Sequence, residues 1–192
     1  MLKEDLLIPK EEKKSFPPIP ENVYQVELFD VNTELKPKYK NPEEKEEKLS
    51  FQFVLLAGKD KDGSELRGRN VWRNFIPTSL YIGKTGKNLL YQVLEAILGR
   101  ELSPEDEATM DGKKINSLIG RQLRVIVKNE TKDGKVYSNI ETFLSKEIDY
   151  PALTEEEKED ARVKNEKEET ESIPNVPEVF SLTELEPSDI KF

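Results

Sequence analysis

Residues 49–57, which read Leu-Ser-Phe-Gln-Phe-Val-Leu-Leu-Ala, form the stretch that decides the fold. Five apolar side chains recur at every second position from its first residue to its last, with Ser50 and Gln52 on the opposite face. This period of two is typical of a β-strand that buries one of its faces. An Asp-Gly turn within residues 60–63 follows, so we predict that the chain reverses there and forms another strand over residues 66–76.

The same rules give the other elements of a mainly β fold. We predict strands over residues 23–31, 122–128 and 136–143, the last two joined by a hairpin turn at Asp-Gly. Apolar residues at helical spacing over residues 89–98 predict a helix that ends at Gly99. A short helix follows at residue 103, because Ser-Pro-Glu-Asp is a helix-start pattern.

This element order predicts a five-stranded Greek-key barrel of the OB type, with a helix between the third and fourth strands. An open α+β sheet is the alternative. The barrel is preferred because an open sheet leaves the Phe-rich strand near an exposed edge.

Charge divides the chain into three parts. The net charge is −9, and residues 151–192 alone hold 13 acidic and 5 basic side chains. We therefore expect an N-terminal arm over residues 1–20, one OB-type domain over residues 21–150, and an acidic flexible tail over residues 151–192. Within the tail, residues 154–172 are expected to be a solvated helix turn or unstructured, although Thr154 and Glu157 suit a helix start.

Composition limits the functional classes. The chain contains no Cys and no His, which removes disulfides, the usual zinc sites and the commonest general base. No membrane-spanning run or signal peptide is evident, so we expect a cytoplasmic protein that does not bind membranes. Residues 83–87 read Gly-Lys-Thr-Gly-Lys but lack the upstream Gly of a nucleotide-binding loop. We predict no enzyme activity and no cofactor or metal, with a nucleotide-binding protein built on residues 83–87 as a rival.

Aromatic and basic residues alternate along residues 67–75, Arg-Gly-Arg-Asn-Val-Trp-Arg-Asn-Phe. Aromatic rings stack on the bases of single-stranded nucleic acid, while Lys and Arg bind its phosphates. Periodicity does not decide whether Trp72 or Phe75 is exposed. The residues predicted to contact DNA are Tyr39, Arg67, Arg69, Trp72, Arg73, Phe75, Tyr81, Lys84, Lys87, Arg121, Arg124, Lys128, Lys135 and Tyr137.

Several runs follow one another in the central part of the chain: Gly-Arg-Asn-Val-Trp at 68–72, Leu-Glu-Ala-Ile-Leu-Gly at 94–99, Leu-Ile-Gly-Arg-Gln-Leu-Arg-Val at 118–125 and Gly-Lys-Val-Tyr-Ser-Asn-Ile at 134–140. In their order and spacing, residues 20–147 resemble phage-encoded single-stranded-DNA-binding proteins. The resemblance implies a non-enzymatic protein that coats single-stranded DNA during replication or recombination. The alternative is a protein-interaction or structural β-domain, such as one of a phage particle, that does not bind nucleic acid.

The acidic tail ends in Asp189-Ile190-Lys191-Phe192, which resembles the Asp-Ile-Pro-Phe tip of bacterial single-stranded-DNA-binding proteins. Lys191 stands where that family has Pro. In the family the tip is a docking peptide, so the resemblance implies that Asp189, Ile190 and Phe192 recruit replication or recombination proteins. Self-association is compatible with the sequence but not specified by it.

Overall fold

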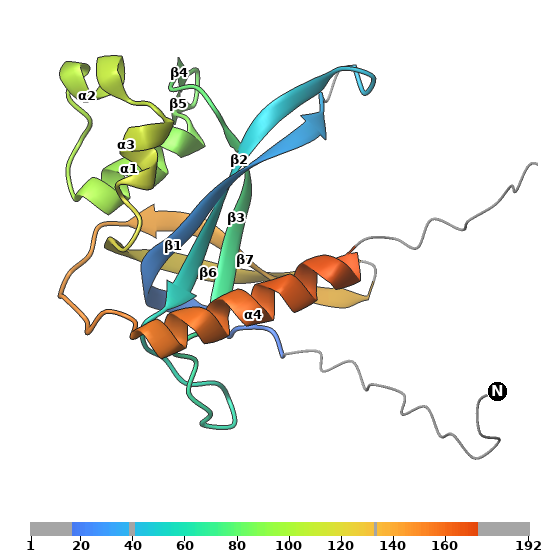
Figure 1. Cartoon of the computed structure of the whole chain (residues 1–192). Coiled ribbons are helices and arrows are strands. Elements are labelled where there is room, and N and C mark those ends of the chain that lie inside the picture. Colours follow the sequence, from blue (N-terminus) through green and yellow to red (C-terminus); the bar gives the residue numbers. More distant parts are fainter. Residues whose placement is uncertain (1–16, 39–40, 133, 173–192) are drawn as a thin grey trace, which may run out of the picture.

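The structure, a computed structural model, describes residues 17–38, 41–132 and 134–172. Figure 1 shows a curled sheet with small helices at one end and a longer helix across its front. The elements are β1 (Asn22–Pro37), β2 (Lys45–Leu55), β3 (Asn70–Pro77), β4 (Ile82–Gly83), β5 (Gly86–Lys87), α1 (Leu89–Leu98), α2 (Pro104–Thr109), α3 (Gly112–Asn116), β6 (Gln122–Lys132), β7 (Lys135–Leu144) and α4 (Glu155–Ser172).

The five long strands form one antiparallel sheet in the order β3-β2-β1-β6-β7. The mainly β prediction is confirmed, as are the helices between the third and fourth long strands. The predicted closed barrel is wrong. In the described part of the chain no hydrogen-bonded ladder joins the two edge strands, β3 and β7, although some of their Cα atoms lie within 8 Å.

Residues 17–20 connect these two edges. The Arg69 guanidinium, just before β3, donates to the Pro17 carbonyl at 2.5 Å, and the Ile19 N–H donates to Ser138 Oγ on β7 at 2.8 Å. The Ile19 side chain is buried in the core. A segment packed between two strands keeps their backbones from pairing directly, which accounts for the open seam at this end of the sheet.

The core is centred on β2, as the alternating pattern predicts. Phe51, Phe53 and Leu55 are fully buried, and the ring centroids of Phe53 and Phe143 are 5.8 Å apart across the sheet's interior. The sheet's curvature brings β6 and β7 behind β1 and β2, so that inward side chains of all four strands meet (Figure 1). Burial of such side chains stabilises the fold by about 1.5–3 kcal/mol for each one.

Helix α1 begins and ends, and helix α2 begins, where the sequence predicts, whereas the short helix α3 was not predicted. The Asn88 side chain accepts a hydrogen bond from the Tyr91 N–H at the start of α1, and Gly99 ends the helix with φ 71°. Ser103 and Asp106 form a capping box at the start of α2. Helix α1 packs its apolar side against β3, β6 and β7, so it covers one end of the curled sheet.

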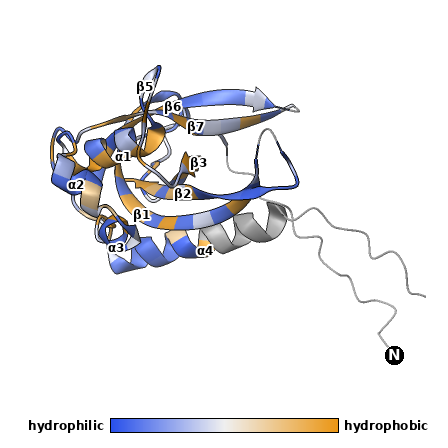
Figure 2. Cartoon of the chain, turned by 90° about the horizontal axis from the view of Figure 1, so that it is seen from above, coloured by the Kyte–Doolittle hydropathy of each residue, from blue (hydrophilic) through white to orange (hydrophobic). Residues whose placement is uncertain are grey.

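Helix α4 lies across the outer face of β1, β2 and β3 (Figures 1 and 2). Leu153 and Ala161 are buried against Val54 and Leu56, whose side chains point away from the main core. The helix and the burial of Ala161 correct the expectation of a solvated or unstructured segment for the part of it whose side chains the structure describes. The sequence pattern does not indicate this contact, because among the described residues of this strongly charged segment only Leu153 and Ala161 are apolar and buried in it.

Polar contacts fix the start of α4. Arg67 Nε donates to a Glu157 carboxylate oxygen at 2.6 Å, and the same guanidinium donates to the Leu56 and Ala152 carbonyls at 2.8 and 3.1 Å. The Arg67 hydrogen bond lowers the pKa of Glu157 to about 2. The predicted cap is also present, with the Glu157 N–H donating to Thr154 Oγ1 at 3.2 Å. No described helix has the length and apolar character needed to cross a membrane.

Candidate nucleic-acid interface

Phe75 is the most unusual of the predicted contact residues. Its side chain is 62% exposed, and its backbone has φ 63°, in the left-handed region that bulky residues avoid. The cause is a β-bulge: Leu49 pairs with Ile76 and Phe51 with Arg73, so Asn74 and Phe75 together face a single residue of β2. Bulges at sheet edges redirect side chains, and this one presents the ring to solvent.

A cation accompanies the exposed ring. The Lys36 ammonium, from the end of β1, lies 5.3 Å from the Phe75 ring centroid. Lys36 also pairs with Glu34 at 2.6 Å, and neighbouring Lys48 pairs with Glu46 at 3.0 Å. The surroundings of Phe75 therefore carry both signs of charge. Sequence reasoning did not single out Lys36, whose only signal was its place in a Lys-rich loop segment.

Trp72, the other aromatic residue of β3, is partly buried, whereas Phe75 is exposed. Its partner across the sheet is Gln52, on the outer face that α4 partly covers. The side chains there bond to one another: Gln52 Nε2 donates to Asn70 Oδ1 at 3.2 Å, and Asn70 Nδ2 donates to the Ala161 carbonyl at 3.1 Å. Phe75 is thus the aromatic residue of β3 that is freely accessible.

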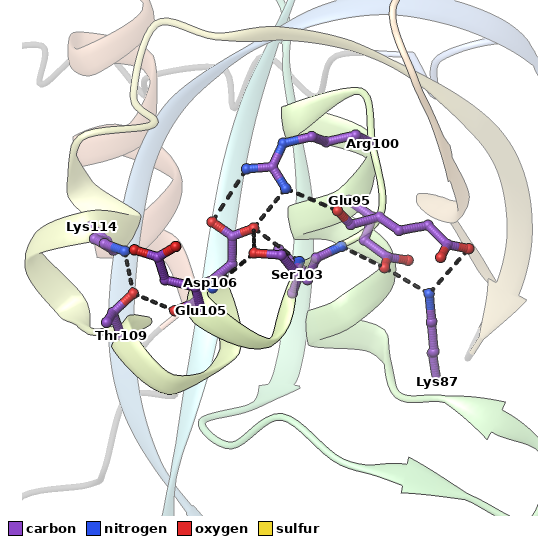
Figure 3. Close-up of polar contacts among 10 residues, drawn as sticks. Lys87, Glu95, Arg100, Ser103, Glu105, Asp106, Thr109 and Lys114 are labelled. Atoms are coloured by element: carbon purple, nitrogen blue, oxygen red, sulfur yellow. Dashed lines mark hydrogen bonds and ion pairs between the residues drawn. The ribbon is translucent and has the colours of Figure 1, made fainter.

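Several predicted DNA contacts are instead engaged within the protein. Lys87 pairs with Glu95 at 2.7 Å and lies 3.6 Å from Glu101 (Figure 3). Arg67 holds the start of α4, and Arg69 bonds Pro17. The remaining two are on the β6–β7 side: Arg124 Nη1 lies 2.5 Å from Glu147, and Lys128 lies 2.8 Å from Glu141. These side chains already bind partners within the protein, so they are weaker candidates for phosphate contacts.

Three other predicted cations, Lys84, Arg121 and Lys135, have no acidic partner within the part of the chain that the structure describes. Lys84 lies in the β4–β5 hairpin beside Tyr81, whose ring is 53% exposed. Lys135 begins β7, close in sequence to Tyr137, which is 47% exposed. Each hairpin therefore presents an aromatic ring with a free cation near it in sequence.

Arg73, a predicted DNA contact on β3, is neither paired with a carboxylate nor fully exposed. Its side chain is partly buried, and its Nε has no hydrogen-bond partner among the described residues. Burial lowers the pKa of the guanidinium below its ordinary value. Arg73 shares a strand face with buried Val71, and therefore points to the inner side of the sheet rather than toward α4.

The predicted residues do not form one compact site. Phe75 and Arg73 share an edge strand, whereas the β4–β5 and β6–β7 hairpins lie in different parts of the molecule (Figure 1). Tyr39 and the tip residues Asp189, Ile190 and Phe192 lie outside the described residues. Among the described residues there is no cluster of acidic side chains that could hold a metal ion.

Comparison with models of known protein families gives no match to the chain, and a search of curated proteins finds no relative. What bears on function is therefore the geometry of the described residues, above all those of β3.

Proposed function

We propose that the chain is a non-enzymatic protein that binds single-stranded DNA, built on a partly open sheet of the OB type. Phe75 is the observation that carries the proposal. A large apolar ring is exposed on a strained backbone, in an arrangement that costs about 1–3 kcal/mol and contributes nothing to the core. Such strain is typical of a ligand site, and a stacked base is the ligand that a lone accessible ring fits best.

The strand order supports the OB type. OB barrels have five strands in a Greek-key arrangement, are partly open, and bind their ligands on the second and third strands. Here the bulged Phe75 lies on the third long strand, beside the second, and the helices follow it in the chain. Tyr81 with Lys84 and Tyr137 with Lys135 would provide further stacking and phosphate contacts on two hairpins.

A titration of labelled oligo-dT at several salt concentrations tests the proposal. The logarithm of affinity should fall with the logarithm of salt concentration by about 0.7 for each phosphate that the protein neutralises. Duplex DNA of equal length should bind much more weakly. Equal affinity for duplex and single strand, or binding that ignores salt, would instead favour the protein-interaction alternative.

A matched pair of variants links the binding to Phe75. Phe75→Ala should weaken oligo-dT binding by about 1–3 kcal/mol, the usual effect of removing a stacked ring. Ile148→Ala is the control, because Ile148 is also an exposed apolar side chain (58%) but lies outside every predicted contact. Equal losses for both variants would show that Phe75 has no special role.

The C-terminal tip remains a second part of the proposal. On the resemblance of residues 189–192, Phe192 and Asp189 would bind replication or recombination proteins while the sheet binds DNA. Deleting Phe192 alone should abolish that recruitment and leave oligo-dT affinity unchanged. Recovery of the same replication proteins with and without Phe192 would remove this part of the proposal.

A further inference from the structure

Arg73 is a partly buried guanidinium whose charge the described residues leave uncompensated. Its Nε is buried with no hydrogen-bond partner, and no carboxylate of the described chain pairs with it. Five of the six other arginines have a carboxylate 2.5–3.9 Å away, namely Arg67, Arg69, Arg100, Arg124 and Arg162. The sixth, Arg121, has no acidic partner among the described residues either, but its side chain is exposed to water whereas that of Arg73 is partly buried.

The position of Arg73 leaves it open to a ligand. It lies on β3, an edge strand, immediately before the bulge that exposes Phe75. Strand β7 approaches β3 without pairing with it, and residues 17–20 contact this edge at Arg69, just before β3 begins. No described strand pairs with the outer edge of β3 at Arg73. Helix α4 packs on the opposite side, where Asn70 bonds the Ala161 carbonyl.

A guanidinium N–H that is buried without an acceptor destabilises a folded protein, because the water that would accept its hydrogen bond is removed and nothing replaces it. Arginine cannot escape this penalty by losing its proton at neutral pH, even when burial lowers its pKa. The free energy is recovered when an anion binds. The planar, forked guanidinium is suited to phosphate, which it can bind through two parallel hydrogen bonds.

We propose that Arg73 is the centre of a phosphate-binding site on the open edge of β3, and that its ligand is a backbone phosphate of single-stranded DNA. The identity of the ligand rests on the proposed function. Arg73 and Phe75 are two residues apart, so their Cα atoms are at most about 7 Å from each other. Because no described strand pairs with the outer edge of β3, one DNA strand lying along this edge can place a phosphate on Arg73 and a base on Phe75.

The test combines affinity with thermal stability in the full chain. Arg73→Met should weaken binding of a 15-nucleotide oligo-dT by about tenfold, as expected for the loss of one charge-assisted hydrogen-bonding group. The same variant should raise the Tm without ligand, because a similar volume replaces an unpaired charge. Arg73→Lys keeps the positive charge but loses the forked guanidinium, so its affinity for oligo-dT should lie between those of the wild-type protein and Arg73→Met.

Lys61→Met is the matched control, since it removes one positive charge from an exposed turn. It should leave both affinity and Tm nearly unchanged. If Arg73→Met lowers the Tm and binds oligo-dT as well as the wild-type protein does, Arg73 is a structural residue and the inference is wrong. Equal weakening by Lys61→Met would also overturn it, because net charge alone would then explain the loss.

Two further probes separate this site from the proposed function. An abasic oligonucleotide keeps the phosphates and removes the bases, so its binding should depend on Arg73 and not on Phe75. Inorganic phosphate, compared with chloride at equal ionic strength, should raise the Tm of the wild-type protein more than that of Arg73→Met. If phosphate acts through Arg73 while neither oligonucleotide binds, the phosphate site stands and the single-stranded-DNA function fails. If oligo-dT binds normally to Arg73→Met, the function stands and the site fails.

Discussion

A phenylalanine in left-handed backbone geometry is a local conflict that the sequence does not reveal. The run Trp-Arg-Asn-Phe-Ile does not predict the φ of 63° that Phe75 adopts. The conflict arises only when β3 pairs with β2 in a register that leaves one residue too many. The ring is not part of the core, and the proposed contact with a DNA base would give this exposed side chain a role.

Glycine and alanine at position 75 separate the backbone strain from the role of the ring. In an ordinary strand, Gly is less stable than Ala by about 0.5–1 kcal/mol. At φ 63° the order should reverse, so Phe75→Gly should unfold at a higher temperature than Phe75→Ala by the equivalent of about 1 kcal/mol. Both variants should lose the same oligo-dT affinity. Thermal melts beside fluorescence titrations measure this, and a more stable Ala variant would contradict the strained geometry.

Among the elements, α4 shows how a charged segment can still belong to a fold. Its contact with the sheet uses Leu153, Ala161 and the bidentate Arg67–Glu157 pair, over an apolar patch that β2 supplies. That patch exists because Val54 and Leu56 alternate with the core residues of β2. Sequence reasoning read the inward face of this strand correctly but gave the outward apolar pair no partner.

Two truncations test whether α4 is part of the folded unit. Removing residues 173–192 should leave the Tm unchanged. Removing residues 151–192 should lower it, because Val54 and Leu56 lose their cover, at about 1.5–3 kcal/mol for each side chain exposed. The flexible-tail expectation for residues 151–192 predicts no change in either case. Equal melting temperatures for the two truncated proteins would show that α4 contributes nothing to stability.

At the scale of the whole molecule, local patterns predicted more than long-range contacts did. The strands, the capped helices and their order follow from periodicity and from residues such as Asn88, Gly99 and Ser103, which act on their own neighbours. The open seam depends on Ile19, which meets Ser138 across the chain. For the same reason, the sequence pattern lists candidate DNA contacts but does not separate Lys87, which pairs with Glu95, from Lys84, which has no acidic partner among the described residues.

The distribution of charge over the molecule leads to the last prediction. Residues 173–192 hold four acidic side chains and one basic side chain, tethered to a domain whose free cations include Lys84 and Lys135. A tethered anionic segment competes with DNA because its effective concentration is high, and salt weakens the competition, since the Debye length is about 10 Å at 0.1 M. Removing residues 173–192 should therefore raise oligo-dT affinity slightly at low salt and have no effect at high salt.

A full-length variant with Glu178, Glu184 and Glu186 changed to Gln is the control, and should show most of the same gain in affinity. A gain that persists at high salt, or that appears only on deletion, would mean that the segment obstructs DNA by its bulk and not by its charge.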